Sequence, residues 1–334
     1  MSANLPDYIN HFLQPSSFSH PVSSVELVQT HISYVIIAGD FVYKFKKPVD
    51  FGFLNFTTLE KRKHYCLQEL TLNKRLCPDI YRDVITVTRE EDGFQLSGTG
   101  EVVEYGVMMT RMPEEKMMGR LLKAGKVNKE MIRRIVDTLV PFYEKADSDT
   151  EIQQFGTAEA VSVNVLENFE QTRDFVGQDA LSEDQYNTIS GYARTFLENE
   201  ALFLQRSKTH VKDCHGDMYS ANICLADNVH IFDCIEFNER FRYCDIASDV
   251  AFLAMDLDFH GREDLSGFFI SSFVSASNDP GLRDVLNFYK CYRAYVRGKI
   301  GLFTASSPEV DDVTKAGSLE QAGKYFQLAE KYAA

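Results

Sequence analysis

The sequence lacks long apolar runs, a leading basic–apolar segment and an excess of positive charge. No stretch of about 18 apolar residues occurs, so we expect no membrane-spanning helix. The first residues do not resemble a signal peptide, because no basic segment precedes an apolar one. A net charge of −14, from 35 Lys and Arg against 49 Asp and Glu, disfavours nucleic acid and anionic membranes as partners. These absences favour a cytoplasmic protein.

The seven cysteines lack the spacing of a disulfide framework or of a zinc site. Their number is odd and the chain is long, which favours a reducing compartment. Four of them recur every ten residues, at Cys214, Cys224, Cys234 and Cys244. Structural zinc sites normally use ligand pairs two to four residues apart. We therefore expect buried or loop cysteines and no zinc.

The secondary-structure pattern changes near residue 112. Before it, after a short helix over 5–14, β-rich runs and short turns predict a mainly antiparallel sheet with one major helix over 57–76. After it, helical patterns dominate, and a loop with a strand–turn–strand interrupts them over 213–233. The predicted fold class is α+β, with a small β-rich N-lobe at 1–112, a hinge, and a larger, mainly helical C-lobe at 113–334. The expected strands are 25–30, 33–39, 41–48, 83–88, 94–97 and 101–109, and the expected C-lobe helices are 114–123, 128–145, 162–175, 182–207, 245–259, 264–277, 281–304 and 318–333.

The strongest chemical signal is the loop His215-Gly216-Asp217, followed by Asn222 and, one strand–turn–strand later, by Asp233. Phosphoryl transfer from ATP needs an oriented hydroxyl group, a metal that bridges the phosphates, and neutralised charge. Asp217 can accept a hydroxyl proton, and Asn222 and Asp233 carry the oxygen ligands that magnesium prefers. His-Gly-Asp alone also suits a surface turn. The added Asn222 and Asp233 favour a catalytic loop that contains His215, Asp217 and Asn222.

These residues resemble a known family. His215-Gly216-Asp217 through Asn222, with Asp233, is similar to the aminoglycoside phosphotransferase and choline kinase branch of the protein-kinase-like superfamily. The segment from Asp245 to Asp249 resembles the one that opens the next helix in that branch. The resemblance implies a bilobal kinase-like fold, Mg²⁺ held by Asn222 and Asp233, ATP as co-substrate, and a bracing role for Asp245 and Asp249.

The resemblance also implies an N-lobe lysine on the third strand with a glutamate partner on the following helix. Lys44 is the expected phosphate-binding lysine. Lys46 is the runner-up, because side chains two apart on a strand point to the same face. Glu69, in the middle of the predicted helix, is the expected partner. For Lys46 and Lys47 a solvated basic edge is the favoured interpretation.

The sequence has no glycine-rich loop of the form G-x-G-x-x-G between its first two strands. Thr30 and Ser33 lie in the turn there, and their hydroxyls or nearby backbone N–H groups are the expected phosphate contacts. By its position, the stretch before Pro113 is the hinge, so Met109, Arg111 and Met112 are expected to contact the nucleotide.

The acceptor site is the least defined part. Asp256 and Asp258 could bind hydroxyl or amino groups of a substrate. On a late helix, Tyr289, Arg293 and Arg297 share one face at i, i+4 spacing. That face could hold an anionic acceptor through Arg293, or it could pair internally with the aspartates, which is the favoured alternative.

The sequence thus predicts transfer of the ATP γ-phosphoryl group to a hydroxyl of a small polar metabolite: a sugar, an amino sugar, an aminoglycoside-like compound or an amino alcohol. A kinase acting on protein side chains is disfavoured, because only eleven residues separate Asp233 from Asp245. A catalytically silent nucleotide-binding regulator ranks last, because the base and metal ligands are all present. The identity of the acceptor, a role in antibiotic resistance and the oligomeric state do not follow from the sequence.

Overall fold

The computed structural model describes residues 5–308 and 310–334, which divide into two compact units. The N-terminal unit ends at Lys116 and also takes in His230–Glu239, and the second unit consists of Met117–Val229 and Arg240–Ala334. The sequence placed every residue after 112 in one lobe. The structure differs at His230–Glu239, because the backbone of this segment bonds to N-terminal residues: the Cys234 N–H donates to Asn73 Oδ1 at 2.9 Å.

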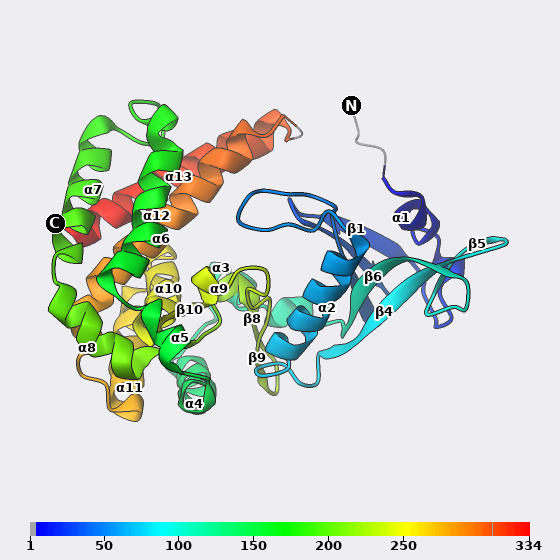
Figure 1. Cartoon of the computed structure of the whole chain (residues 1–334), viewed down its shortest axis with the longest axis horizontal. Helices are drawn as coiled ribbons and strands as arrows, with labels where there is room; N and C mark the ends of the chain where they lie inside the picture. The colour runs from blue at the N-terminus through cyan, green and yellow to red at the C-terminus, as the bar shows by residue number, and fades with distance from the viewer. Residues whose placement is uncertain (1–4, 309) are drawn as a thin grey trace. The chain divides into compact units, whose positions relative to one another are not determined.

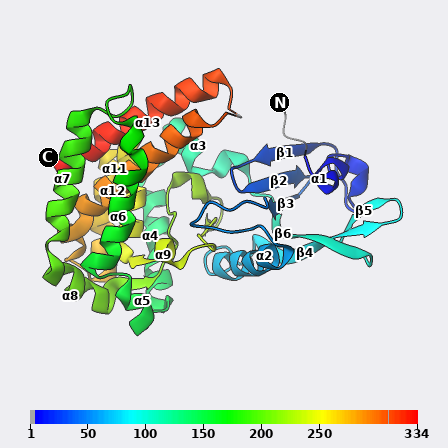
Figure 2. The same cartoon turned by 45° about the horizontal axis from the view of Figure 1, so that its top comes forward.

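The N-terminal unit is a six-stranded antiparallel sheet (Figures 1 and 2). The spatial order is β1-β2-β3-β6-β4-β5. Gly39 forms the turn between β2 and β3 with a φ of 59°, and a Cβ there would lie 2.7 Å from the Pro21 carbonyl oxygen. The predicted antiparallel sheet is confirmed. Its strands are β1 (Val25–Gln29), β2 (Ser33–Ala38), β3 (Phe41–Lys46), β4 (Tyr81–Glu90), β5 (Gly93–Leu96) and β6 (Glu101–Thr110).

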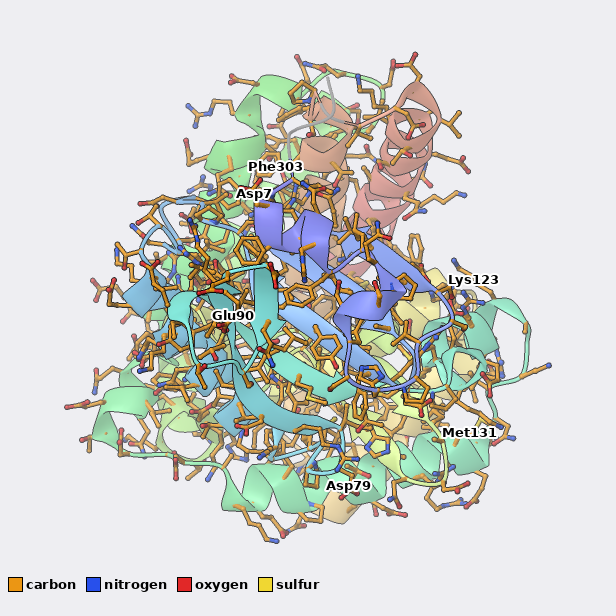
Figure 3. The ribbon with its side chains drawn as sticks, turned by 90° about the vertical axis from the view of Figure 1, so that its right-hand side faces the viewer. Asp7, Asp79, Glu90, Lys123, Met131 and Phe303 are labelled. Carbon is orange, nitrogen blue, oxygen red and sulfur yellow. The ribbon has the colours of Figure 1, made fainter. Side chains whose placement is uncertain are left out.

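The major helix of this unit is α2 (Leu59–Asn73). It begins where the Thr58 hydroxyl accepts a hydrogen bond from the Lys61 N–H, which satisfies one of the first N–H groups of the helix. The helix packs against β4 and β6. Asp79 and Glu90, both labelled in Figure 3, mark the approach to β4 and its end.

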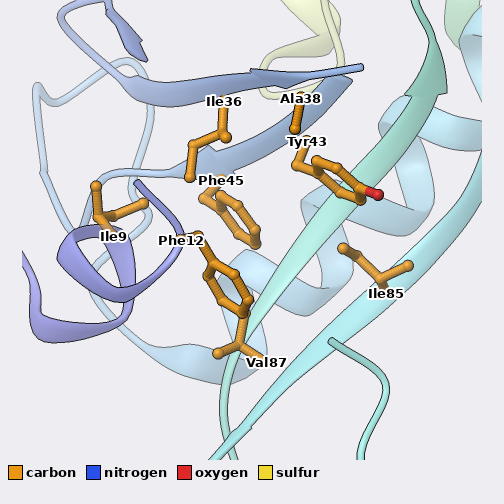
Figure 4. Packing of buried hydrophobic residues seen from close by; sticks show 8 residues of the cluster. All are labelled: Ile9, Phe12, Ile36, Ala38, Tyr43, Phe45, Ile85 and Val87. Carbon is orange, nitrogen blue, oxygen red and sulfur yellow. The ribbon is translucent and has the colours of Figure 1, made fainter. Parts of the chain in front are cut away.

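The opposite face of the sheet carries the apolar core of the unit. Because side chains alternate along a strand, Tyr43 and Phe45 of β3 point to this face, whereas Lys44 and Lys46 point to the other. The short helix α1 (Asp7–His11) covers the apolar face. Figure 4 shows the cluster, which consists of Ile9, Phe12, Ile36, Ala38, Tyr43, Phe45, Ile85 and Val87. This packing holds β3 in place and leaves its lysines for the face of α2.

The second unit is mainly helical. The helix predicted over 182–207 is in fact two, α7 and α8, because the chain turns at Glu198 and Asn199. Three short strands, β7 (Val211–Asp213), β8 (Ile223–Leu225) and β10 (Tyr243–Asp245), lie near the loop that holds Asp217; β9 (Val229–Ile231) lies where the chain passes between the units. The helices are α3 (Met118–Lys123), α4 (Lys129–Lys145), α5 (Thr150–Gln154), α6 (Ala158–Thr172), α7 (Glu183–Leu197), α8 (Glu200–His210), α9 (Glu239–Arg242), α10 (Ile246–Phe259), α11 (Glu263–Ser277), α12 (Leu282–Ser306) and α13 (Asp312–Ala333).

Helix α10 is the centre of the second unit. Every residue from Ala247 to Leu257 is buried, and the helix packs against α11 and α12. The Asp245 side chain caps its start by accepting the Ala247 N–H at 2.8 Å. An all-round buried helix carries polar residues only where they find partners, so its aspartates, Asp249 and Asp256, point to specific contacts. In the part of the chain that the structure describes, no helix is both long and apolar enough to cross a membrane.

Candidate active site

The loop that follows β7 is held in place by one buried carboxylate of α10. Asp249 Oδ2 accepts the His215 N–H at 2.7 Å, and Asp249 Oδ1 accepts the Gly216 N–H at 2.9 Å. Gly216 has a φ of 87°, which only glycine adopts without strain. The His215 ring is fully buried, and its Nδ1 accepts the Asp217 N–H at 3.3 Å. The backbone on both sides of Asp217 is therefore fixed.

Asp217 itself is held by Asn222. The Asn222 Nδ2 donates to the Asp217 carbonyl oxygen and to Asp217 Oδ2, both at 2.9 Å. Asn222 is buried, whereas Asp217 is partly exposed. The amide nitrogen of Asn222 thus orients the carboxylate, and the amide oxygen, a hard ligand atom, points elsewhere.

Two further side chains support the same loop. Asp256 Oδ2 accepts the Ser220 N–H at 2.9 Å, and Arg293 Nη1 donates to the Gly216 carbonyl oxygen at 3.0 Å. Both side chains are buried. Sequence reasoning missed this bracing role. The signal was the polar character of Asp256 in an otherwise apolar helix.

The structure gives internal partners to all three residues considered for the acceptor. Asp256 and Arg293 hold the loop, and Asp258 bonds to Lys290 Nζ at 2.5 Å and to the Tyr332 hydroxyl. Internal pairing, the favoured alternative, describes their contacts. The partners differ from the expected ones, because Arg293 lies beside Asp249, with Nη2 3.8 Å from Oδ1, and does not pair with Asp256 or Asp258.

Asp245 and Asp249 contribute in different ways. Asp249 contacts the loop directly, as the resemblance implied. Asp245 is bound by Arg206, through Nε at 2.5 Å and Nη2 at 2.8 Å, and Arg206 also bonds to Asp279. Asp245 therefore anchors the start of α10 and acts on the loop only through the helix.

In the N-terminal unit, Lys44 joins two carboxylates. Its Nζ lies 2.8 Å from Glu69 Oε1 and donates a hydrogen bond to Asp233 Oδ1 at 2.6 Å. The Asp233 side chain is 45% exposed, whereas Glu69 is buried. The three residues that the sequence assigned to phosphate and metal binding in this unit thus come together.

A second ion pair lies behind this group. Lys46 Nζ donates to Glu69 Oε2 at 2.7 Å and to Glu236 Oε1, and the Lys46 side chain is 1% exposed. The interpretation of Lys46 as a solvated basic edge is therefore wrong, because α2 and the segment of Glu236 cover it. Glu236 was missed. The only sign in the sequence that Glu236 belongs to this cluster is its position three residues after Asp233.

The pKa values of this cluster follow from burial and charge. Burial alone would raise the pKa of Glu69, but Lys44 and Lys46 lower it to about 2. Burial would lower the pKa of Lys44, but Asp233 and Glu69 raise it well above its usual value. Burial raises the pKa of Glu236 despite Lys46. Two lysines face three carboxylates, so with all five ionised the cluster has one net negative charge, and Asp233 is its most exposed member.

The backbone places Asp233 in an uncommon conformation. Its φ is 62°, in the left-handed region that aspartate tolerates better than most residues. The Tyr81 hydroxyl accepts the Asp233 N–H at 3.3 Å, and Asn73 holds the next residue. These contacts fix the direction of the carboxylate.

The turn between β1 and β2 is closed by its own residues. The Thr30 hydroxyl accepts the Ile32 N–H at 3.3 Å and the Ser33 N–H at 3.0 Å. Thr30 is exposed, whereas the Ser33 hydroxyl is buried and meets no hydrogen-bond partner among residues 5–308 and 310–334. Ser33 lies opposite Lys46 across β2 and β3. Thr30 is therefore the better placed of the two for a ligand at the surface.

The predicted hinge continues β6. The Met109 side chain is largely buried, and Met109 lies between Val42 and Tyr81 in the sheet. The Arg111 N–H donates to the Asp40 carbonyl oxygen at 2.8 Å, so this N–H is already used within the unit. The Arg111 side chain is exposed and Met112 is partly exposed.

Each of the two units carries one of the residues that the sequence assigned to the metal. Asp233 offers a half-exposed carboxylate and Asn222 an oriented amide oxygen. In the described residues, no group of three or more His, Cys, Asp and Glu side chains is arranged to hold a metal. Magnesium is usually bound by one or two protein carboxylates together with water and phosphate oxygens.

Comparisons of the sequence with known proteins found relatives but no family. No family model matches the chain. Uncharacterised proteins of Mycobacterium bovis and Mycobacterium tuberculosis are 31% identical over 299 residues. The match covers 87% of this chain and 58% of theirs, so the chain spans little more than half the length of these relatives.

Solved structures with the same architecture include three enzymes of related kinds. An APH(2'') aminoglycoside phosphotransferase in complex with GDP and kanamycin has a TM-score of 0.55 at 12% identity, covering 95% of this chain and 98% of its own. A choline/ethanolamine kinase family protein from Mesorhizobium loti has a TM-score of 0.52 at 14% identity, covering 95% and 94%. A microcompartment-associated aminopropanol kinase has a TM-score of 0.52 at 14% identity, covering 97% of both chains. The chain thus shares its protein-kinase-like fold with these structures.

Proposed function

We propose that this chain transfers the γ-phosphoryl group of ATP to a hydroxyl of a small polar metabolite, with Mg²⁺. The observation that carries the proposal is the fixation of Asp217. Asn222 holds its carboxylate at 2.9 Å, and Asp249 binds the two N–H groups that precede it. A partly exposed carboxylate held by so many contacts is preorganised to act on a bound group.

In this proposal, Asp217 orients the acceptor hydroxyl and accepts its proton. The oxygen then forms a bond to the γ-phosphorus, the bond from that phosphorus to the β–γ bridging oxygen breaks, and ADP leaves. His215 is fully buried and acts as a support of the loop. Asp249, Asp256 and Arg293 are positioning residues, because their hydrogen bonds to the loop join its backbone N–H and carbonyl groups.

Lys44 is the proposed phosphate contact of the nucleotide. Glu69 holds the ammonium group of Lys44 at 2.8 Å. A phosphate oxygen would take the place of Asp233 as the other partner of this group, or bind to the group beside Asp233. Asp233 and Asn222 would hold Mg²⁺, which neutralises phosphate charge when bound. Lys46 lies too deep to reach a ligand, so we assign the phosphate contact to Lys44 rather than to Lys46.

The acceptor class is a sugar, an amino sugar, an aminoglycoside-like compound or an amino alcohol. The printed names of similar structures include a kanamycin complex, a choline/ethanolamine kinase family protein and an aminopropanol kinase. Those names describe other proteins, which are 12–14% identical to this chain. Similarity at this level supports the fold, and the names serve only to choose the first compounds of a substrate screen.

The test compares Asp217→Asn with Asp227→Asn as a matched control, because Asp227 is an exposed aspartate of the same unit. Purified proteins are incubated with Mg²⁺ and ATP, and then with a library of the four acceptor types, while ADP release is measured. We expect acceptor-stimulated ADP release in the wild type and the control. Asp217→Asn should lower kcat by about 10² or more, with little change in ATP binding. Normal turnover in Asp217→Asn would exclude this role of Asp217.

A further inference from the structure

Arg297 differs from the other buried or partly buried arginines that surround the Asp217 loop. Arg206 pairs with Asp245, Arg242 with Asp213 at 2.7 Å, and Arg293 lies beside Asp249. Among residues 5–308 and 310–334, no ion pair joins Arg297 to a carboxylate, and its buried Nε meets no hydrogen-bond acceptor. Its side chain has a hydrogen bond with Tyr325 and feels the charge of Asp217. A partly buried cation that no carboxylate pairs with directly has an incompletely balanced charge. Such a cation is expected to have a ligand that supplies the negative charge.

The position of Arg297 links it to the Asp217 loop. It lies one helical turn after Arg293 on α12, and Arg293 contacts the Gly216 carbonyl oxygen. Its guanidinium stacks over the Tyr219 ring, with the centroid 4.7 Å from Cζ. Tyr219 is two residues after Asp217, so Arg297 borders the loop on the side of α12.

A second ring lies near the same guanidinium. Tyr325 of α13, which runs beside α12 (Figures 1 and 2), has its centroid 5.7 Å from Arg297 Cζ. The Tyr325 hydroxyl also accepts a hydrogen bond from this guanidinium, so it takes part of the edge that carries the N–H groups. The remaining N–H groups of the edge can donate to a further in-plane acceptor. Tyr325 in turn stacks on Phe259 at 3.8 Å, so its ring is held in place.

The exposure of these groups indicates that Arg297 and Asp217 can both reach a ligand. Asp217, Tyr219 and Arg297 are all partly exposed, whereas the residues between the first two and on either side, Gly216, Met218 and Ser220, are buried. Burial alone would lower the pKa of Arg297, but Tyr219, Tyr325 and Asp217 raise it, so the guanidinium keeps its charge beside the loop.

We propose that Arg297 binds an oxyanion beside Asp217, either the phosphoryl group being transferred or a carboxylate or phosphate substituent of the acceptor. The proposal deepens the proposed function and rests on it for the identity of the reaction. Both sources offer the same chemistry, a planar or tetrahedral set of anionic oxygens that a guanidinium edge binds with two N–H groups.

The test uses Arg297→Met and Arg297→Lys, with Arg283→Met as the matched control. Arg283 is an exposed arginine of the same helix, so its loss changes the net charge equally. The first measurement needs no activity: thermal unfolding is followed while inorganic phosphate is titrated. We expect phosphate to raise the Tm of the wild type and of Arg283→Met, and this rise to be lost in Arg297→Met. An equal rise in all the proteins would overturn the proposal.

Steady-state kinetics then distinguish the two sources. Turnover is measured without an added acceptor, so that water is the only one, and then with glycerol, a neutral acceptor, and with glycerate, an anionic one. It is also measured with the acceptor that the library screen finds. If Arg297 binds the transferred phosphoryl group, Arg297→Met lowers kcat by about tenfold or more with every acceptor. If it binds the acceptor, KM rises only for anionic acceptors. Arg297→Lys should restore part of either effect, because lysine keeps the charge and loses the paired N–H groups.

Failure of this inference is distinguishable from failure of the proposed function. A wild type without Mg²⁺- and ATP-dependent turnover for any acceptor would contradict the proposed function, and the phosphate titration would still decide the role of Arg297. Kinetic constants of Arg297→Met within twofold of Arg283→Met, in an active enzyme, would reject a role for Arg297 in the reaction.

Discussion

At the residue scale, the cluster around Glu69 brings several charged side chains together in a buried place. Lys46 is 1% exposed and bonds to two carboxylates, Glu69 and Glu236. Breaking a buried ion pair from one side leaves an uncompensated charge, which commonly costs about 3–5 kcal/mol. The cluster is therefore a structural requirement of the N-terminal unit as well as a support for Lys44.

We expect Lys46→Met to lower the free energy of unfolding by about 3–5 kcal/mol. Lys47→Met is the neighbouring control: Lys47 is partly exposed and stacks on Tyr34, so its loss should cost about 1 kcal/mol or less. Urea unfolding of the two variants and the wild type gives the comparison. Equal losses in the two variants would show that Lys46 is not a stabilising partner of Glu69.

The pH dependence of stability should report Glu69. Its pKa in the folded chain is about 2, below its usual 4.5. The unfolded chain therefore binds the proton first as the pH falls, and the stability contributed by Glu69, complete above pH 4.5, is lost between 4.5 and about 2. The raised pKa of Glu236 acts with the opposite sign at higher pH.

Urea unfolding of the wild type and Glu69→Gln from pH 7 to pH 2 measures this effect. The wild type should be the more stable protein at pH 6, and its advantage should shrink as the pH falls below 4.5. A constant difference between the two proteins over the whole range would mean that Glu69 does not titrate as assigned.

At the element scale, α10 is both the core of the second unit and the support of the Asp217 loop. Two carboxylates near its start have separate tasks: Asp249 binds the loop N–H groups, and Asp245 binds Arg206 and caps the helix. A change at Asp249 should therefore affect the reaction, whereas a change at Asp245 should affect mainly the stability.

Asp249→Asn replaces one acceptor oxygen by a donor, so it cannot accept both loop N–H groups. We expect kcat to fall by about 10², the effect of a small displacement of the reacting groups, with KM for ATP nearly unchanged. Asp245→Asn should lower Tm clearly, because the helix loses its cap and its pairing with Arg206, and it should change kcat much less than Asp249→Asn does. Steady-state kinetics and thermal unfolding of both variants test this division, which the reverse order of effects would contradict.

The elements themselves were largely predictable from the sequence, and their ends were less so. Alternation marked the strands, and the helical spacing of apolar positions over 57–76 marked α2. The break between α7 and α8 was missed, because Glu198 and Asn199 are ordinary helix residues in composition and no Gly or Pro marks the turn. The residues at this turn do not by themselves predict that one helix ends and another begins there.

At the scale of the whole molecule, one short stretch of sequence carries the predicted catalytic loop and metal ligands. Asp217, Asn222 and Asp233 lie within 17 positions of one another, so spacing alone singled them out. The ion pair of Lys46 and Glu236 joins residues 190 positions apart, and only the folded chain brings them together. The contacts of Asp256 and Arg293 with the loop were missed for the same reason.

The discontinuous N-terminal unit has a consequence for the order in which the chain can fold during synthesis. Lys46 and Glu69 are made early, but Glu236 follows Lys46 by 190 residues. At usual rates of translation, roughly 10 to 40 s pass before it emerges. Until then Lys44 and Lys46 share a single carboxylate of the cluster, that of Glu69, so the cluster carries an unbalanced positive charge. The unit can therefore reach its final stability only after most of the second unit has left the ribosome.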